Sequence, residues 1–285
     1  MDKTKPNLDD LRREIDDIDT ALHDLIMRRA AIVEHVAEAK GKQADSGMRP
    51  GREARILRRL AARHTGPFIR GSMLRIWREI IATLTMMQGP YSVAVFTDDA
   101  DGLWDLARDQ FGSYTDLNGA ATRREVVAGV AGGRWTHGVL PYPAETDDRP
   151  WWAGLWSTDA PQVVLRLPFV EPGNGRDRGA SALVIARVSP EESGDDRSLL
   201  LLETSASVRR PVIGEMLAAA GLEGEIVCAA TDGTAQYLAE ASGFLEKGDS
   251  RVAALSTQKI VERVRVIGTY PTPLDGASGR KGFSS

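Results

Sequence analysis

A long helical pattern of apolar positions fills the first forty residues. Leucine, isoleucine and valine recur mostly at spacings of three and four from Leu8 to Val36, and no proline or glycine interrupts them before Gly41. Such spacing places the apolar side chains on one face of a helix. The pattern predicts a helix over 8–40, about 50 Å long. That is too long for a compact monomer of this size, so we expect the apolar face to need a partner chain.

Two shorter helices are predicted next, over about 52–64 and about 67–88. The sequence "HTGPF" separates them, and "QGP" ends the second one at Pro90. No strand pattern occurs in these first 89 residues. Beyond Pro90, short apolar strands alternate with helical segments, which is typical of an α/β unit.

The fold class that follows is multidomain, with a helical part and α/β parts. We expect an all-helical region over 1–89 and a reduced α/β lobe over 90–175. From Ser198 the predicted order is strand, helix, strand, strand, helix, strand, which is a ferredoxin-like arrangement. It falls within a third region over 176–285, whose tail after Leu274 we expect to be disordered. The cluster "WWAGLW" at 151–156 favours a core or interface role over a ligand platform.

Composition excludes several classes of protein. With 42% hydrophobic and 27% charged residues, the chain is typical of a soluble protein, and no apolar run is long enough to cross a membrane. Its one cysteine, Cys228, excludes an internal disulfide and a paired-cysteine metal site. Four scattered histidines argue against a histidine metal site, so we expect neither metal nor cofactor. The polar N-terminus has no signal-peptide pattern, which predicts a cytoplasmic location.

Charge is distributed unevenly between the two ends of the chain. Residues 1–90 carry 17 Lys and Arg against 13 Asp and Glu, whereas residues 91–285 carry 19 against 27. The positive part therefore predicts an anionic ligand at the N-terminal helices, although a solvated helix face explains much of the same excess. Binding to nucleic acid is disfavoured, because the excess is modest and acids are interleaved, as in "REIDDID".

Three cations on the long predicted helix are candidates for binding that anion. Arg29 and Lys40 are eleven positions apart, which puts them on nearly the same face and about 16 Å apart along the axis. Arg12 lies about 100° around the helix from Arg29. All three cannot easily serve one small ligand from one chain, but an antiparallel partner helix would bring Arg12 to the other chain's site. The alternative is that each is a solvated surface charge.

A second candidate motif is "MRPGREARIL", which contains Glu53 as an isolated acid among arginines. An acid in the first turn of a helix is favourable by itself, because the free N–H groups there carry partial positive charge. The surrounding arginines suggest instead that one acceptor is needed among cations.

These segments together resemble a known family. The runs "LDDLRREIDDIDTALHDLIMRRAAIVEHVAEAK", "MRPGREARIL" and "IWREIIATLTMMQ" are similar to the all-helical chorismate mutase domain of the AroQ class, over residues 8–88. The resemblance implies an intertwined homodimer in which Arg12 crosses into the partner's site. It also implies six active-site positions: Arg12, Arg29, Lys40, Arg52, Glu53 and Gln88.

The chemistry implied by the resemblance fits these residue types. Chorismate is a dianion that rearranges to prephenate in one concerted step, so the enzyme holds a compact conformer and stabilises charge on the ether oxygen. Guanidinium groups bind carboxylates through two parallel hydrogen bonds, which suits Arg29 and the other chain's Arg12. Lys40 and Gln88 would donate hydrogen bonds to the ether oxygen.

The remaining two positions have supporting roles in this assignment. Glu53 would accept a hydrogen bond from the ring hydroxyl, and Arg52 would support the charge network. Two positions depart from the family. Arg49 stands where an acid can occur, and Leu84 stands where a small hydroxyl residue often lies, a loss worth about 1 kcal/mol of binding.

The rest of the chain resembles related proteins more weakly. "GVLPYPAETDD", residues 138–148, looks like a motif of prephenate dehydratase, but the Thr-Arg-Phe signature is missing, so we expect a catalytically inactive lobe. The region at about 198–270 resembles an ACT regulatory domain without its phenylalanine-binding motifs. Ser205, Ser207 and Arg209 could bind an aromatic amino acid effector there, although plain turn and cap roles fit them better.

Two other functions are alternatives to that of an enzyme. One is a non-catalytic sensor that uses the mutase fold to bind a metabolite and the C-terminal region to signal. Keeping Arg29, Lys40, Glu53 and Gln88 together argues against it, because a binding module has little need for two ether-oxygen donors. The other is the nucleic-acid binder disfavoured above.

Overall fold

The computed structural model describes residues 7–40, 48–97, 102–145, 150–205, 208–232, 234–246 and 248–276. Its N-terminal part consists of three helices, as the sequence predicts: α1 (Leu8–Lys40), α2 (Pro50–Ala62) and α3 (Arg70–Met86). Helix α2 begins at Pro50 rather than at Arg52, because proline has no N–H and a fixed φ that suit the first helical position.

An α/β region follows, and most of its elements match the predicted pattern. The first elements are β1 (Ser92–Phe96), α4 (Leu103–Phe111), β2 (Asp116–Ala120), α5 (Arg123–Ala131), β3 (His137–Pro141), a 3₁₀ helix η1 (Trp151–Trp156), β4 (Gln162–Leu167), β5 (Val170–Glu171) and β6 (Ala182–Ala186). The last are β7 (Asp196–Thr204), α6 (Arg210–Ala219), β8 (Gly224–Asp232), β9 (Thr234–Ser242), α7 (Ser250–Ser256), β10 (Val261–Pro271) and β11 (Leu274–Asp275).

One sheet of nine strands carries this region, in the order β2-β1-β3-β6-β4-β10-β7-β9-β8. The last four strands, with α6 and α7 between them in sequence, form the predicted ferredoxin-like unit. Strand β6 pairs with both β3 and β4, and β4 pairs with β10, so the sheet is continuous across the predicted boundary near residue 175. The domain boundaries themselves remain predictions. Of the predicted disordered tail after Leu274, Asp275 is ordered and pairs with Glu171 of β5, and residues 277–285 lie outside the described part.

A buried carboxylate links the two halves of the sheet. Glu240 on β9 accepts hydrogen bonds from Tyr142 (2.8 Å) and from Tyr270 on β10 (2.6 Å). Burial, and then the negative charge of Glu240, raise the pKa of both tyrosines above the ordinary value. Both phenols therefore remain protonated donors, and the carboxylate is satisfied inside the protein.

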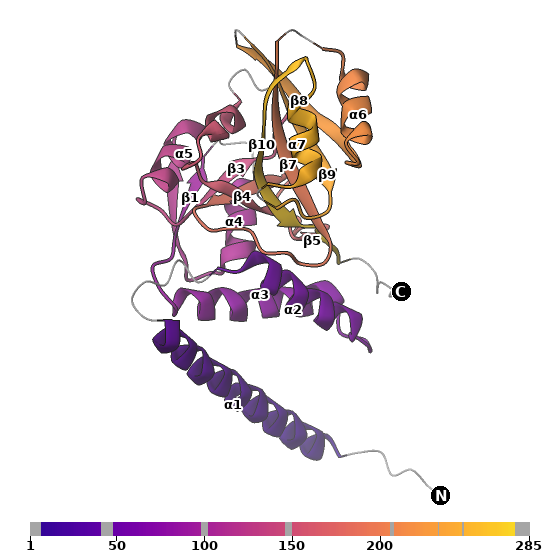
Figure 1. Cartoon of the computed structure of the whole chain (residues 1–285). Helices are drawn as coiled ribbons and strands as arrows, with labels where there is room; N and C mark the ends of the chain where they lie inside the picture. Colours follow the sequence, from indigo (N-terminus) through magenta and orange to yellow (C-terminus); the bar gives the residue numbers. More distant parts are fainter. Residues whose placement is uncertain are drawn as a thin grey trace, which may run out of the picture.

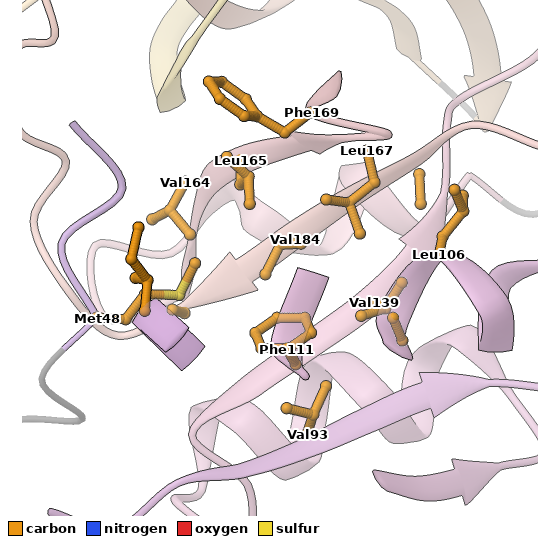
Figure 2. Packing of buried hydrophobic residues seen from close by; sticks show 14 of the residues in the cluster. Met48, Val93, Leu106, Phe111, Val139, Val164, Leu165, Leu167, Phe169 and Val184 are labelled. Carbon is orange, nitrogen blue, oxygen red and sulfur yellow. The ribbon is translucent and has the colours of Figure 1, made fainter. Parts of the chain in front are cut away.

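Helices α2 and α3 pack on the α/β region (Figure 1). Buried side chains of the helices, such as Leu57 and Leu74, belong to one hydrophobic cluster with residues of the sheet and α4. Figure 2 shows part of that cluster, including Met48 just before α2 and Phe111 at the end of α4. Gly51 lies so close to the backbone of Glu191 that a Cβ there would come within 2.3 Å of its carbonyl oxygen.

Helix α1 is in a different situation. It extends away from the rest of the chain (Figure 1), and almost all of its side chains are exposed. The exposed set includes the apolar positions that the sequence pattern aligned: Leu8, Leu11, Ile15, Ile18, Leu22, Leu25, Ile32 and Val36. In a single chain, the apolar face predicted for this helix is uncovered.

The structure corrects or completes three details of the sequence-based picture. Strand β2 was not predicted, because "DLNGA" lacks an apolar run and lies at the sheet edge. Strand β4 was also missed, although its "QVVLRL" is apolar and mostly buried. The tryptophan cluster is core, as expected, with Trp151 and Trp152 both buried.

Candidate functional site

A cavity of about 460 Å³ lies where α1, α2 and α3 meet. Helix α1 contributes Arg29 and helix α2 contributes Arg52, Arg55 and Arg59, so four arginines line one space. Of these, Arg55 donates a hydrogen bond from Nη1 to the carbonyl of Glu192 at 2.9 Å. No acidic side chain is found among the described residues that line it. Apolar side chains complete the wall: Ile56, Leu60, Trp77, Ile80 and Ile81. The arrangement suits an anion with an apolar or ring-shaped body.

Arg29 is the least solvated of these cations. Its side chain is half-buried, and its Nη1 is buried without a hydrogen-bond partner among the described residues. Burial, and secondly the positive charge of Arg52, lower the pKa of Arg29 below its ordinary value. A buried donor without an acceptor is costly, and a carboxylate would satisfy it and offset the repulsion from Arg52.

Glu53 lies on the other side of α2, against the α/β region. Its side chain is 9% exposed, and its Oε2 accepts a hydrogen bond from Nη2 of Arg78 on α3 at 2.5 Å. Its Oε1 has a longer contact of 3.4 Å with the backbone N–H of Arg49. The nearby Tyr91 has a raised pKa, mainly from burial and secondly from the charge of Glu53. The single chain therefore does not place Glu53 among the residues that line the arginine cavity.

The other predicted site residues lie at the edges of the helical part. Gln88 follows α3, is half-buried and donates a hydrogen bond from Nε2 to the carbonyl of Leu84 at 3.0 Å. Lys40 is the last residue of α1, and its side chain lies outside what the structure describes. Arg12 is exposed and pairs with Asp9 at 3.3 Å on the same helix. The structure thus brings Arg29 and Arg52 together, and Arg12, Glu53 and Gln88 are not among the residues that line their cavity.

Sequence reasoning missed four residues of this neighbourhood: Arg55, Arg59, Trp77 and Arg78. For Arg78 a signal was present, because it shares a helical face with Leu74, Ile81 and Thr85, all of which are buried. An arginine at a core position needs an acidic partner. The sequence could therefore have pointed to a buried ion pair, although not to Glu53 as the partner.

The remaining expectations concern other parts of the chain. Ser205 donates its backbone N–H to the carbonyl of Ile260, and Arg209 stands at the N-cap position of α6. Ser207 lies outside the described residues. Among the described residues, no group of three or more histidine, cysteine, aspartate or glutamate side chains could hold a metal ion. None of the described helices combines the length and apolar character of a membrane span.

Comparison with known proteins supports the helical part most strongly. Residues 11–89 match the family model described as chorismate mutase type II, which confirms the resemblance seen in the sequence. The bifunctional chorismate mutase/prephenate dehydratase of Pseudomonas aeruginosa is 30% identical over 142 residues, 48% of this chain and 39% of that protein. The protein of the same description from Aquifex aeolicus is 30% identical over 138 residues, 47% of this chain and 38% of its own length. The aligned part therefore spans about two-fifths of these relatives.

Solved structures give weaker likenesses. A structure described as GqqA, a novel type of quorum quenching acylases, has a TM-score of 0.49 and 16% identity, covering 65% of this chain and 96% of its own. The prephenate dehydratase of Streptococcus mutans has a TM-score of 0.47 and 13% identity, covering 65% of this chain and 99% of its own. Both TM-scores are below 0.5, and both identities are below 20%.

Proposed function

We propose that the chain is a chorismate mutase that converts chorismate to prephenate in the cytoplasm, on the route to phenylalanine and tyrosine. The arginine cavity carries the proposal: four arginines line a space suited to a small dianion, and Arg29 among them has a buried N–H without an acceptor among the described residues. The family match over residues 11–89 supports the same chemistry. No cofactor is needed, because the rearrangement is a single concerted shift of electrons in the substrate.

The proposed enzyme is a homodimer whose sites are shared between chains. An uncovered apolar face along α1, with Ile15 and Leu22 each more than half exposed, is the main support for a second chain. A long helix with such a face is stable when a partner helix covers it. Among the described residues Arg12 pairs with Asp9, and this exposed pair costs little to break. In the dimer, Arg12 of the partner subunit would bind one substrate carboxylate and Arg29 the other.

Four further residues complete the proposed mechanism. Lys40 and Gln88 would donate hydrogen bonds to the ether oxygen as its bond breaks, and Arg52 would hold the charge network. Glu53 would accept a hydrogen bond from the ring hydroxyl. Its Oε2 is committed to Arg78, whereas the weak contact at Oε1 leaves that oxygen able to accept. Substrate binding would therefore require α2 and α3 to present Oε1 to the cavity.

A direct test follows the loss of chorismate by absorbance. We expect Lys40→Ala and Glu53→Gln each to lower kcat/KM by at least about 100-fold, because each removes a group that stabilises the transition state. Arg63→Gln, an exposed arginine at the end of α2, should match the wild type. Glu53→Gln also breaks a buried ion pair, so its folding must be checked by urea unfolding. Equal rates for all four proteins would contradict the assignment.

The burial of Glu53 against Arg78 is the one observation that favours a non-catalytic sensor. A sensor would bind chorismate or prephenate in the arginine cavity without turning it over. Calorimetry and the absorbance assay separate the two functions: chorismate binding with no catalysed loss supports the sensor, and binding with loss supports the enzyme.

For the α/β region we propose a regulatory or scaffolding role, with an inactive dehydratase-like lobe at 90–175 and an ACT-like unit after it. Purified protein should leave prephenate unconverted to phenylpyruvate, and conversion would contradict the inactive lobe. An aromatic amino acid effector would bind at the ACT-like unit. Isothermal titration with Phe, Tyr and Trp tests this, and the absence of heat with all three would remove it.

A further inference from the structure

A second cavity, of about 560 Å³, lies on the opposite face of α3 and is not used by the proposed mutase site. It is enclosed by the first turns of α3, the middle of α4 and the segment from the end of β4 through residue 174. Its volume is in the range of sites for small organic ligands. It shares no lining residue with the arginine cavity.

One side of this cavity is apolar. Leu74, Leu106, Leu167 and Phe169 line it and are buried within the large hydrophobic cluster. Figure 2 shows Leu106, Leu167 and Phe169 as members of that cluster. Pro168, Val170 and Pro172 add further apolar surface. Such walls exclude water from the hydrocarbon part of a ligand and favour its burial.

Two arginines line the other side, Arg70 and Arg78, and each has a buried Nε without an acceptor among the described residues. Arg78 is nine-tenths buried, and its Nε has no hydrogen-bond partner among the described residues, although its Nη2 binds Glu53. The Nε of Arg70 is likewise buried and without a partner in the described part of the chain. Unsatisfied buried donors of this kind cost free energy unless a ligand accepts from them.

Helix α3 begins at the same side of the cavity. Arg70, Gly71 and Ser72, in its first turn, line the space, and no side chain of the described residues caps the helix at Ile69. The free N–H groups of a helix start favour negative charge. The one acid in the lining, Asp109, is already engaged by Arg75 and Asn174, so it does not supply the missing acceptor.

We propose that this cavity binds a small organic anion, with one carboxylate held by Arg70, Arg78 and the first turn of α3 and an apolar body packed against Leu106, Leu167 and Phe169. The apolar wall favours a ligand with a hydrocarbon body. The buried Nε groups of Arg70 and Arg78, which have no acceptor among the described residues, favour a ligand with a negative charge. A ligand that has only one of the two features should bind more weakly.

Calorimetry on the full-length chain tests both requirements with three probes. 3-Phenylpropionate carries a carboxylate and an apolar ring, 3-phenylpropanamide has the same shape without the charge, and inorganic phosphate has the charge without the ring. We expect 3-phenylpropionate to bind about tenfold more tightly than either of the others. No heat with 3-phenylpropionate up to about 10 mM, or equal affinity for all three probes, would overturn the proposal.

Variants place the binding in this cavity rather than in the arginine cavity. Arg70→Gln should weaken 3-phenylpropionate about tenfold, and Ser72→Trp, at the exposed rim, should block it by filling the entrance. Arg63→Gln should bind the probe as the wild type does, and Arg29→Gln, which alters only the arginine cavity, should keep the binding that Arg70→Gln and Ser72→Trp remove. Thermal unfolding confirms that each variant is folded. A loss with Arg29→Gln and none with Arg70→Gln or Ser72→Trp would overturn the site. The measurement needs no mutase activity, so it succeeds or fails independently of the proposed function.

Discussion

Helix α1 and the pair α2–α3 all have amphipathic patterns in the sequence, but the apolar face of the pair is buried whereas that of α1 is mostly exposed. The apolar faces of α2 and α3 are buried against side chains of the sheet and α4. Arg58 of α2 also donates hydrogen bonds to the carbonyls of Ser193 and Asp195, more than a hundred residues along the chain. Most of the apolar face of α1 is exposed, from Leu8 to Val36. Periodicity therefore predicts that a helix has an apolar face but not whether the same chain covers it. In our account a second chain covers α1.

The largest effect should come from placing charge on the uncovered face. If α1 pairs with a second copy, Ile15→Glu with Leu22→Glu puts four charges into the dimer interface, at a cost of about 6 kcal/mol in dimer stability. Sedimentation equilibrium should then show a monomer. The control Thr20→Glu, on the opposite face of the helix, should remain a dimer. A dimer that persists in the double variant would contradict the account of α1.

The next effect concerns the covered pair of helices. Arg78→Met leaves the Glu53 carboxylate buried without its partner, which should lower the free energy of unfolding by about 3–5 kcal/mol in urea titrations. The double variant Arg78→Met/Glu53→Gln removes the unpaired charge and should recover more than half of that loss. Equal losses of unfolding free energy in the single and double variants would show that an unpaired Glu53 charge is not the cause of the instability.

A pH-dependent effect should follow from His137, which packs against Tyr91 and Phe111 near the end of α3. Burial lowers the pKa of His137 from 6.5 to about 3. The unfolded chain therefore takes up a proton near pH 6.5, whereas the folded chain does not. Stability from this group is complete above pH 6.5 and should fall by about 3 kcal/mol on going to pH 4.

The pH effect is measured by comparing urea unfolding of the wild type and His137→Gln at both pH values. The variant should lose less stability on acidification than the wild type. His35→Gln, an exposed histidine on α1, serves as the control and should follow the wild type. A profile of His137→Gln parallel to that of the wild type would exclude this histidine as the cause.

The smallest effects compare one arginine from each region. Arg58 on α2 donates to the carbonyls of Ser193, Asp195 and Thr272, so Arg58→Gln should cost about 2 kcal/mol of unfolding free energy. The contacts of Arg13 within the described part of the chain are to neighbouring groups of its own exposed helix α1, so Arg13→Gln should change stability by less than about 0.5 kcal/mol. Thermal unfolding of the two variants measures both stability losses. Equal losses would remove the contrast between the helices.

How much could be predicted from the sequence differs between levels of structure. The three N-terminal helices and the ferredoxin-like order were predictable, because apolar periodicity and turn residues are local signals. The edge strand β2 lacked that signal. The pairing of β4 with β10 could not be predicted from local patterns either. It depends on Gly268 lying against the backbone of Val163, which is far away in the sequence.

The candidate site shows the same limit. Arg29 and Arg52 were assigned from family motifs, and the structure brings them into one cavity. The partner of Glu53 was not predictable, since Arg78 is 25 residues away and no local pattern links the two. For Arg12 the described part of the chain shows a partner on its own helix, Asp9, and its role in a second chain's site stays a prediction.

The central claim is that one active site needs residues from two chains, and mixing two inactive variants tests it most directly. Arg12→Ala and Arg29→Ala should each be nearly inactive alone. After unfolding and refolding together, half of the dimers should be mixed, each with one intact site, so activity should return to about a quarter of the wild-type value. A mixture no more active than the separate variants would contradict the shared site.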